Sequence, residues 1–176
     1  MDNNQGVLIH GAGWVSTQHI QAFQNNPHTE IVAISSRTLE SAQSRAAEFD
    51  LDVPCYDDYE KALAHPGVDI VSVCTPQHLH PENTIAAAKA GKHIVIEKPA
   101  AMTLEDARAM HDAVKEAGIK TIVSFVLRWN PLFRTLKSMI AEGDLGRVYS
   151  VEADYLSYAG DWWAGFGRGR QREYGG

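Results

Sequence analysis

Cysteine is scarce in this 176-residue chain, which has only Cys55 and Cys74. Both lie in apolar stretches without a paired spacing, a pattern typical of buried thiols in a reducing compartment. The polar N-terminal stretch 2–5 lacks the apolar core of a signal peptide. No apolar run approaches the ~18 residues that would span a bilayer. We therefore expect a cytoplasmic protein that does not enter a membrane.

Basic residues are also in the minority, since 16 Lys and Arg stand against 22 Asp and Glu, for a net charge of −6. Proteins that bind the phosphate backbone of DNA or RNA usually carry a stripe of basic residues. This chain has none, so we expect no nucleic-acid partner. Hydrophobic residues make up 44% and charged residues 22%. This composition is ordinary for a globular protein, and the length suits one full domain.

Short apolar runs alternate with helical stretches along the first two thirds of the chain. This alternation predicts an α/β fold, a doubly wound and mainly parallel sheet. Asp57 with Glu60, and Thr103 with Asp106, have the spacing of capping boxes at two helix starts, and Thr38 can cap a third helix. The six predicted strands are 7–9, 31–34, 53–56, 69–74, 93–96 and 121–126, and the intervening helices are about 14–24, 38–49, 59–64, 82–90 and 103–118.

A glycine-rich segment follows the first predicted strand directly and opens the first helix. Its residues are Gly11, Ala12, Gly13, Trp14, Val15 and Ser16. In a dinucleotide fingerprint the first glycine allows a tight turn, and the second lets the backbone approach a pyrophosphate at the helix N-terminus. Ser16 occupies the third glycine position, where we expect slightly wider helix packing. The alternative is a glycine-rich turn without a ligand.

The end of the second predicted strand is where NAD-binding proteins usually place a carboxylate on the ribose 2′-hydroxyl. This chain has Ser35, Ser36 and Arg37 there instead. Hydroxyls and a guanidinium suit a 2′-phosphate, which favours NADP, with NAD still possible. The alternative is that Arg37 is a solvated residue of the next helix.

Lys98 stands between Glu97 and Pro99 at the end of the fifth predicted strand. Ligands of such sheets bind outside the carboxyl ends of the strands. A lysine on this edge can hydrogen-bond a substrate hydroxyl and, with a lowered pKa, exchange a proton with it. A surface Lys–Glu pair is the alternative.

Taken together, these motifs resemble the glucose–fructose oxidoreductase and inositol dehydrogenase family (Gfo/Idh/MocA). The resemblance covers nearly all of the chain and depends on the joint order and spacing of short segments. These are Gly11 to Gly13 with His19, Asp69 to Val73 leading to Thr75-Pro76 and Leu79-His80, Ala90 to His93, Glu97-Lys98-Pro99, Arg128 to Pro131, and Gly146 to Val148.

The resemblance implies an NAD(P)-dependent dehydrogenase or reductase of sugar or cyclic-polyol type, with a small molecule of that class as its partner. It implies Lys98 as the catalytic residue and a cis Lys98–Pro99 bond. Val126 departs from the polar asparagine that many members place near the nicotinamide. The implied cofactor contacts are Gly11, Gly13, Trp14, Val15, Ser36, Arg37, Thr75, Pro76, Gln77, His80, Glu97 and Lys98.

The two predicted domains are a dinucleotide-binding Rossmann domain, 1–126, and the incomplete start of an α+β substrate domain, 127–176. In the family, a glycine pair like Gly175-Gly176 leads into a helix with the aspartate and histidine that complete the catalytic group. We therefore expect a fragment that is inactive by itself. The alternatives are a non-catalytic NADP-binding sensor or regulatory module, and an inactive remnant that folds poorly.

The last fifty residues yield further expectations. A helix over 131–142 should stop at Gly143 and dock on the first domain through apolar residues at helical spacing: Leu132, Phe133, Leu136 and Ile140. A strand over 148–156 should be frayed or paired with a second copy, which is a route to a homo-oligomer through the second-domain sheet. The tail past Tyr158 should be mobile. Arg128 and Trp162 are candidate substrate contacts, and His78, His80 and Cys74 do not complete a metal-ligand pattern.

Overall fold

The chain divides into two compact units, one ending at Ser124 and the other beginning at Phe125. The computed structural model describes residues 4–156. Among these residues, no helix is both long and apolar enough to cross a bilayer.

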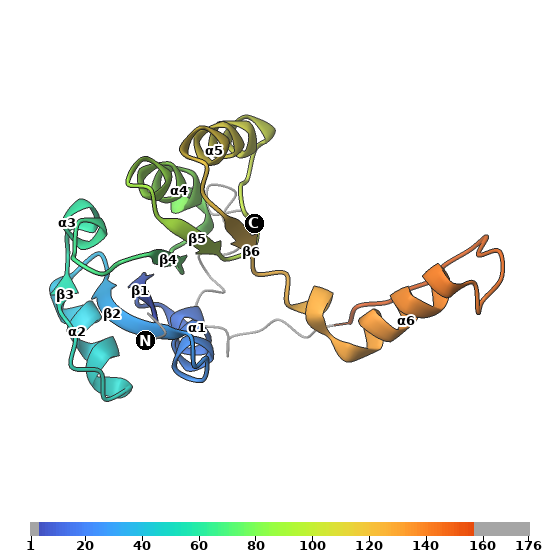
Figure 1. Ribbon diagram of the computed structural model, residues 1–176, viewed down its shortest axis with the longest axis horizontal. Helices are drawn as coiled ribbons and strands as arrows, with labels where there is room; N and C mark the ends of the chain where they lie inside the picture. Colours follow the sequence, from blue (N-terminus) through green and yellow to red (C-terminus); the bar gives the residue numbers. More distant parts are fainter. Residues whose placement is uncertain (1–3, 157–176) are drawn as a thin grey trace. The chain divides into compact units, whose positions relative to one another are not determined.

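The first unit is built on a six-stranded sheet in which every neighbouring pair is parallel, with the order β3-β2-β1-β4-β5-β6 (Figure 1). This confirms the predicted doubly wound fold. The strands are β1 (Gln5–His10), β2 (Thr29–Ser35), β3 (Cys55–Tyr56), β4 (Ile70–Val73), β5 (His93–Ile96) and β6 (Thr121–Val123). The helices are α1 (Trp14–Gln24), α2 (Leu39–Glu48), α3 (Tyr59–Leu63), α4 (His80–Lys89) and α5 (Leu104–Ala117), with a 3-10 turn, η1, at Gln77–Leu79.

The helices cover the two faces of the sheet in separate groups, α1 and α2 on one side and α3, α4 and α5 on the other (Figure 1). Alternate residues of β1 pack on opposite faces of the sheet, because successive side chains of a strand point in opposite directions. Val7 and Ile9 pack with Ile20 of α1, whereas Leu8 packs with Ala87 of α4. The sheet is therefore buried on both faces, which the near-continuous apolar strands require.

Helix ends follow the local signals closely. Thr38 accepts a hydrogen bond from the Ser41 N–H, and Thr103 accepts one from Asp106, so both predicted caps are confirmed. Gly118 follows α5 in the left-handed region at φ 66°, a conformation that glycine adopts without a side-chain penalty.

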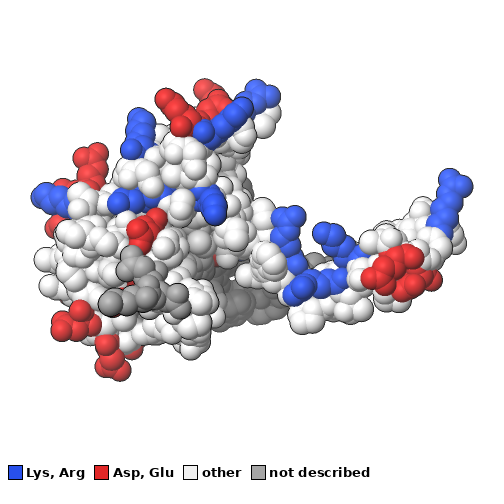
Figure 2. All heavy atoms as spheres, viewed as in Figure 1, with Lys and Arg blue, Asp and Glu red and all other residues white. Residues whose placement is uncertain are grey.

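On the face shown in Figure 2, acidic and basic side chains are interspersed, as on α5 at the top.

Several predicted boundaries differ from the observed ones, since β2 begins at Thr29 and not at 31, β3 at Cys55 and not at 53, and α4 at His80 and not at 82. Two further differences have a local reason. The cap of α3 is Asp58, which accepts from the Lys61 N–H, and not Asp57. With Asp58 as the cap, the residue in the capping-box position is Lys61 and not Glu60. β6 ends at Val123 and not at Val126, because its last ladder bond runs from the Ser124 N–H to the Ile96 carbonyl, where β5 itself ends.

The second unit begins with a 3-10 turn, η2 (Val126–Trp129), and continues into α6 (Pro131–Glu142). Asn130 caps α6 by accepting from the Leu132 N–H, and Gly143 ends it at φ 82°, as predicted. The four apolar residues predicted to dock on the first unit, Leu132, Phe133, Leu136 and Ile140, are exposed, and their docking stays a prediction.

Residues 148–156 are exposed and form no strand in the single chain. The predicted strand is therefore absent from the single chain, where it would have no neighbour to satisfy its backbone groups. Its pairing with a second copy stays a prediction. The predicted mobile tail past Tyr158 lies outside the described residues.

Candidate dinucleotide-binding site

Most of the predicted cofactor residues lie at the carboxyl edge of the sheet. β1 pairs with β2 on one side and with β4 on the other, so the strand order reverses next to β1. In open α/β sheets a crevice forms at this topological switch point, outside the strand ends. The glycine-rich segment begins there, directly after His10.

Gly11 is required by a close approach of two backbones. It has φ 104°, and a Cβ atom there would lie 2.7 Å from both the carbonyl carbon and the carbonyl oxygen of Cys74. Its N–H donates to the Ser35 carbonyl at 2.8 Å, and the Cys74 N–H donates to the His10 carbonyl at 2.7 Å. The loop therefore crosses the ends of β2 and β4 with no space for a side chain.

Gly13 is glycine for a different reason. It is the N-cap of α1 with φ −72°, no side chain caps the helix, and a Cβ atom there would meet nothing within 4 Å. The first turn of α1 contains no acidic residue. Uncapped N–H groups beside an open space fit an anionic group such as a pyrophosphate. Thus the loop suits a dinucleotide, although the fold itself does not require this second glycine.

The first turn of α1 has one fully buried side chain and two that are at least partly exposed to solvent. Ser16 is fully buried, and its hydroxyl donates to the Gly13 carbonyl at 2.7 Å, so a small residue occupies the third glycine position. Trp14 is 75% exposed beside the loop, and Val15 is half-buried.

Ser36 and Arg37 follow β2 at the same edge. The Ser36 N–H donates to the Tyr56 carbonyl at 3.0 Å, which fixes the turn against β3. Ser36 is half-buried and Arg37 exposed, and the Arg37 guanidinium has no hydrogen bond or ion pair within residues 4–156. It is therefore available to a ligand at the carboxyl end of β2, and its predicted contact with a ribose 2′-phosphate stays a prediction.

A buried polar network under the loop was missed by the sequence predictions. Nδ1 of His10 lies 2.8 Å from the Ser35 hydroxyl, and the His10 ring stacks on Tyr59 with the ring centres 3.7 Å apart. The Tyr59 hydroxyl donates to the Asn83 carbonyl at 3.1 Å, and the Asn83 amide donates to the Thr75 hydroxyl at 2.9 Å. Desolvation by burial lowers the pKa of His10 to about 4 despite a hydrogen bond with Asn83, so the ring is neutral at pH 7. The one sequence signal was its place before Gly11.

The segment after β4 is tied to the turn after β5 by His80. This residue is buried, and its two ring nitrogens lie 2.9 Å from the Thr75 carbonyl oxygen and 2.8 Å from that of Pro99. Pro76 is exposed and Gln77 half-buried, on the side where the segment meets solvent. The predicted contacts of Thr75, Pro76, Gln77 and His80 with a cofactor stay predictions.

Glu97 is engaged by the protein itself. Its Oε1 lies 3.0 Å from Nε2 of His19, its Oε2 accepts from the Lys98 N–H at 3.3 Å, and Nδ1 of His19 lies 2.8 Å from the Ser72 hydroxyl. Burial opposes the charged form of His19, but hydrogen bonds with Cys74 and Glu97 outweigh it and raise the pKa of His19 to about 10. Burial likewise raises the pKa of Glu97, but the His19 and Ser124 hydrogen bonds outweigh it and lower that pKa. A buried ion pair therefore lies under this turn.

Lys98 lies on top of this pair, exposed at the carboxyl edge. The Lys98–Pro99 bond is cis, as the resemblance implied. Within the described residues its ammonium group has no hydrogen bond or ion pair. Arg128 is exposed in η2 of the second unit, and Trp162 lies outside the described residues.

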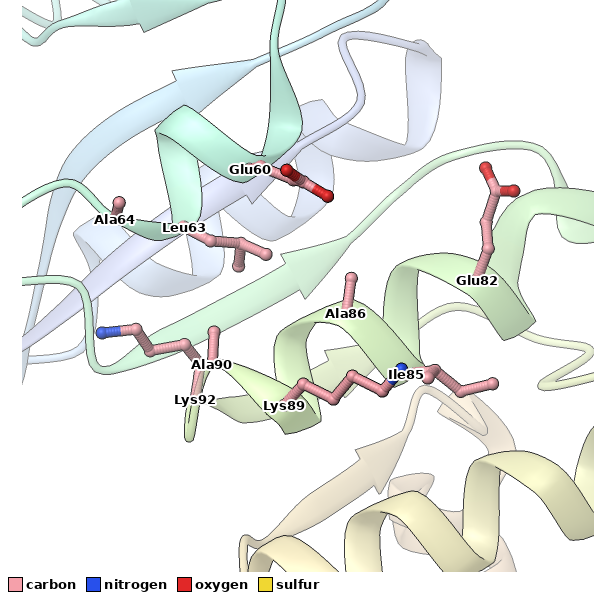
Figure 3. A pocket seen from close by; sticks show the side chains of 9 residues that line it. All are labelled: Glu60, Leu63, Ala64, Glu82, Ile85, Ala86, Lys89, Ala90 and Lys92. Carbon is pink, nitrogen blue, oxygen red and sulfur yellow. The ribbon is translucent and has the colours of Figure 1, made fainter.

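An open groove of about 700 Å³ between α3 and α4 does not overlap this site (Figure 3). Small and apolar side chains such as Leu63 and Ala86 line its middle, and Glu60, Lys89 and Lys92 stand around them (Figure 3). None of the predicted site residues belongs to it. Over residues 4–156, no three His, Cys, Asp or Glu side chains are grouped so as to hold a metal ion.

The six-stranded parallel sheet, its switch point and the loop at the α1 N-terminus define a Rossmann-type nucleotide-binding domain. The chain belongs to the Gfo/Idh/MocA family, described as an oxidoreductase family with an NAD-binding Rossmann fold, which matches residues 5–125. The resemblance inferred from the motifs is thereby confirmed.

Individual relatives agree with this placement. The chain is 34% identical over 169 residues to levoglucosan dehydrogenase of Pseudarthrobacter phenanthrenivorans, covering 90% of this chain and 42% of that protein. It is similar to the crystal structure of the WlbA dehydrogenase from Bordetella pertussis with NADH and UDP-GlcNAcA: TM-score 0.78, 33% identity, 85% of this chain and 43% of the other. It is also similar to the crystal structure of a variant 3-ketoreductase from Actinomadura kijaniata in complex with NADP. The TM-score is 0.73 at 29% identity, and the match covers 80% of this chain and 43% of the other. The chain thus spans less than half the length of these relatives.

Proposed function

We propose that this chain is the cofactor-binding part of an NAD(P)-dependent oxidoreductase acting on a sugar or cyclic polyol. The observation that carries the proposal is the gathering of an uncapped α1 N-terminus, the open Gly13 position and an exposed Lys98 at one edge of the sheet. Levoglucosan dehydrogenase and the complex of WlbA with UDP-GlcNAcA support a sugar-like substrate class.

In this proposal each residue has a distinct role. Gly11 and Gly13 let the backbone approach the diphosphate, and Ser36 with Arg37 contacts the adenosine ribose. A bound nicotinamide cofactor supplies or accepts the hydride. Lys98 donates a hydrogen bond from Nζ to the reacting substrate oxygen and exchanges a proton with it. The buried His19–Glu97 pair supports the turn that carries Lys98.

We further propose that NADP(H) is preferred to NAD(H). The unpaired Arg37 guanidinium supports this preference, since a guanidinium matches the geometry of a phosphate and pairs with it strongly. An interaction of about 1–3 kcal/mol corresponds to roughly a ten- to hundredfold difference in affinity. Calorimetric titration of both cofactors into wild-type and Arg37→Ala chains measures it. Equal or tighter NAD binding by the wild type, or unchanged NADP affinity in the variant, contradicts the preference.

The 176-residue chain is expected to show no measurable dehydrogenase turnover by itself. The family resemblance places an aspartate and a histidine beside the lysine, and the described second unit supplies only η2 and α6 toward a substrate wall. The measurement is cofactor reduction with a panel of sugars and inositols at neutral pH, with Lys98→Met as the matched control. Robust reduction that Lys98→Met abolishes would show that the chain completes a working site.

A non-catalytic NADP-binding sensor is the second candidate. It is favoured by the fact that the phosphate loop, Arg37 and their supports all lie within the first unit. The two candidates differ in their need for Lys98. A sensor retains its cofactor response in Lys98→Met, whereas an enzyme containing this chain loses turnover with little change in cofactor affinity.

A further inference from the structure

Arg45 of α2 reaches across to the back of the glycine-rich loop. Its Nη2 donates to the Ala12 carbonyl at 2.9 Å and to the Gly13 carbonyl at 3.2 Å, and its Nη1 donates to Glu48 at 2.6 Å. The side chain is only 13% exposed. A largely buried guanidinium therefore holds two consecutive carbonyl groups of the loop.

These contacts fix the direction of the neighbouring N–H groups. A trans peptide is planar, so its N–H points opposite to its carbonyl. With the Ala12 and Gly13 carbonyls directed at Arg45, the N–H groups of Gly13 and Trp14 point to the other side of the loop. No side chain caps α1, and a Cβ atom at Gly13 would meet no atom within 4 Å, so these N–H groups have no capping side chain in front of them.

Arg45 also supplies charge that the loop lacks. The segment from Gly11 to Ser16 contains no basic residue. A guanidinium stays protonated at any ordinary pH, and its charge is weakly screened when it is largely buried. The loop thus has a guanidinium behind it, whose carboxylate partner Glu48 is 56% exposed to solvent, and outward-facing N–H groups in front, an arrangement that favours an anion.

We propose that Arg45 is a positioning residue for the diphosphate of the cofactor, orienting the Gly13 and Trp14 N–H groups toward it through the Ala12 and Gly13 carbonyls. The proposal rests on the proposed function, in which a nicotinamide dinucleotide occupies this edge. It differs from the role of Arg37, which concerns only the 2′-phosphate. Arg45 acts on a group that NAD and NADP share.

The test uses ligands that distinguish binding of the diphosphate from binding of the 2′-phosphate. Calorimetry measures the affinity of the 176-residue chain for NADH, NADPH, ADP and 2′-AMP, the last of which has no diphosphate. Arg45→Met is expected to weaken NADH, NADPH and ADP by the same factor, about tenfold, and to leave 2′-AMP unchanged. Arg45→Lys keeps the charge and one donor, so it should recover part of the loss. This pattern is the reverse of Arg37→Ala, which should weaken NADPH and 2′-AMP only.

Two controls separate positioning from a general structural role. Glu48→Gln removes the ion-pair partner of Arg45 without touching the loop, and Arg108→Met removes an exposed arginine of α5. Arg108→Met should leave ADP affinity unchanged, and Glu48→Gln, which removes a negative charge 2.6 Å from the guanidinium, should not lower it. In two-dimensional amide spectra, ADP should shift the Gly13 and Trp14 signals in the wild type and shift them less in Arg45→Met.

Each outcome bears on the proposal. Wild-type ADP binding that Arg45→Met and Arg45→Lys both leave unchanged overturns it, as does an equal loss of 2′-AMP and ADP. If Arg45→Met does not fold, the comparison of ADP with 2′-AMP in Arg45→Lys decides. A wild-type chain that binds none of the four ligands overturns the proposed function together with this inference, whereas intact ADP binding in the Arg45 variants overturns the inference alone.

Discussion

Gly13→Ala is expected to leave the chain folded and to weaken dinucleotide binding at least about a hundredfold. The added methyl group meets no protein atom within 4 Å, and φ −72° is allowed for alanine. Its effect on stability should stay within about 1 kcal/mol, the size of an N-cap exchange. In the bound state, however, the methyl occupies the space that a diphosphate needs to reach the helix N-terminus. Losing two or more charge-assisted hydrogen bonds to the diphosphate accounts for the expected loss of about a hundredfold in affinity.

Gly11→Ala should behave in the opposite way. Its φ of 104° is strained for alanine, and the methyl would clash with the Cys74 carbonyl group, so unfolding should become easier by about 3 kcal/mol or more. Gly91→Ala is the matched control, because its φ is 71° but its surroundings are open. It should cost about 1 kcal/mol and leave binding unchanged. Urea unfolding and NADPH titration of the three variants provide the measurements. Tight NADPH binding by a folded Gly13→Ala chain would refute a diphosphate site at this loop.

Much of the fold was predictable because the signals were local. The strands are short apolar runs, and helix ends at Thr38, Thr103, Gly118 and Gly143 follow from single residues whose side chain or φ decides the boundary. Asp57 and Asp58 form a doublet in which either residue could cap. Only the path of the chain out of β3 selects Asp58, and the sequence carries no signal for that path.

The candidate site was predictable where it depends on backbone geometry and much less where it depends on side chains from distant elements. Gly11 and Gly13 lie between a strand and a helix, which a motif captures. Arg45 is thirty-two residues beyond Gly13 along the chain. Only the packing of α2 against β2 and β3, on the same side of the sheet as α1, brings its guanidinium to the loop. The His10 network has the same character, since His10, Tyr59 and Asn83 come from three separate elements.

The free energy of unfolding should have a maximum near pH 6.5 and decrease on both sides, through two different histidines. On the acid side, the pKa of His10 is about 4 in the folded chain and 6.5 in the unfolded chain. Between these values the unfolded chain binds a proton that the folded chain excludes, so stability decreases as pH falls from 6.5 to 4. The lowered pKa of Glu97 acts in the same direction below its usual 4.5. His10→Gln should reduce this acid-side decrease.

On the alkaline side the decrease in the free energy of unfolding comes from His19, whose pKa is about 10 in the folded chain against 6.5 in the unfolded chain. Its protonated form pairs with Glu97, so the contribution is fully present below pH 6.5 and is lost as pH rises toward 10. The slope should be roughly 1 kcal/mol per pH unit, close to the value for one proton. Burial raises the pKa of Cys55 and of Tyr59, and both groups add to the decrease only at higher pH.

The window from pH 6.5 to 8.5 therefore isolates His19. His19→Gln keeps an amide that can donate to Glu97 and bond to Ser72, but it does not titrate. Urea unfolding of this variant should give a flat profile across the window and a lower free energy than the wild type at pH 6.5. The two curves should approach each other across the window, because the proton that folded His19 keeps is given up by the unfolded chain above pH 6.5, and the contribution is fully lost only near pH 10. Parallel curves would mean that the proton on His19 does not stabilise the fold, and the buried ion pair would then have no part in holding the turn that carries Lys98.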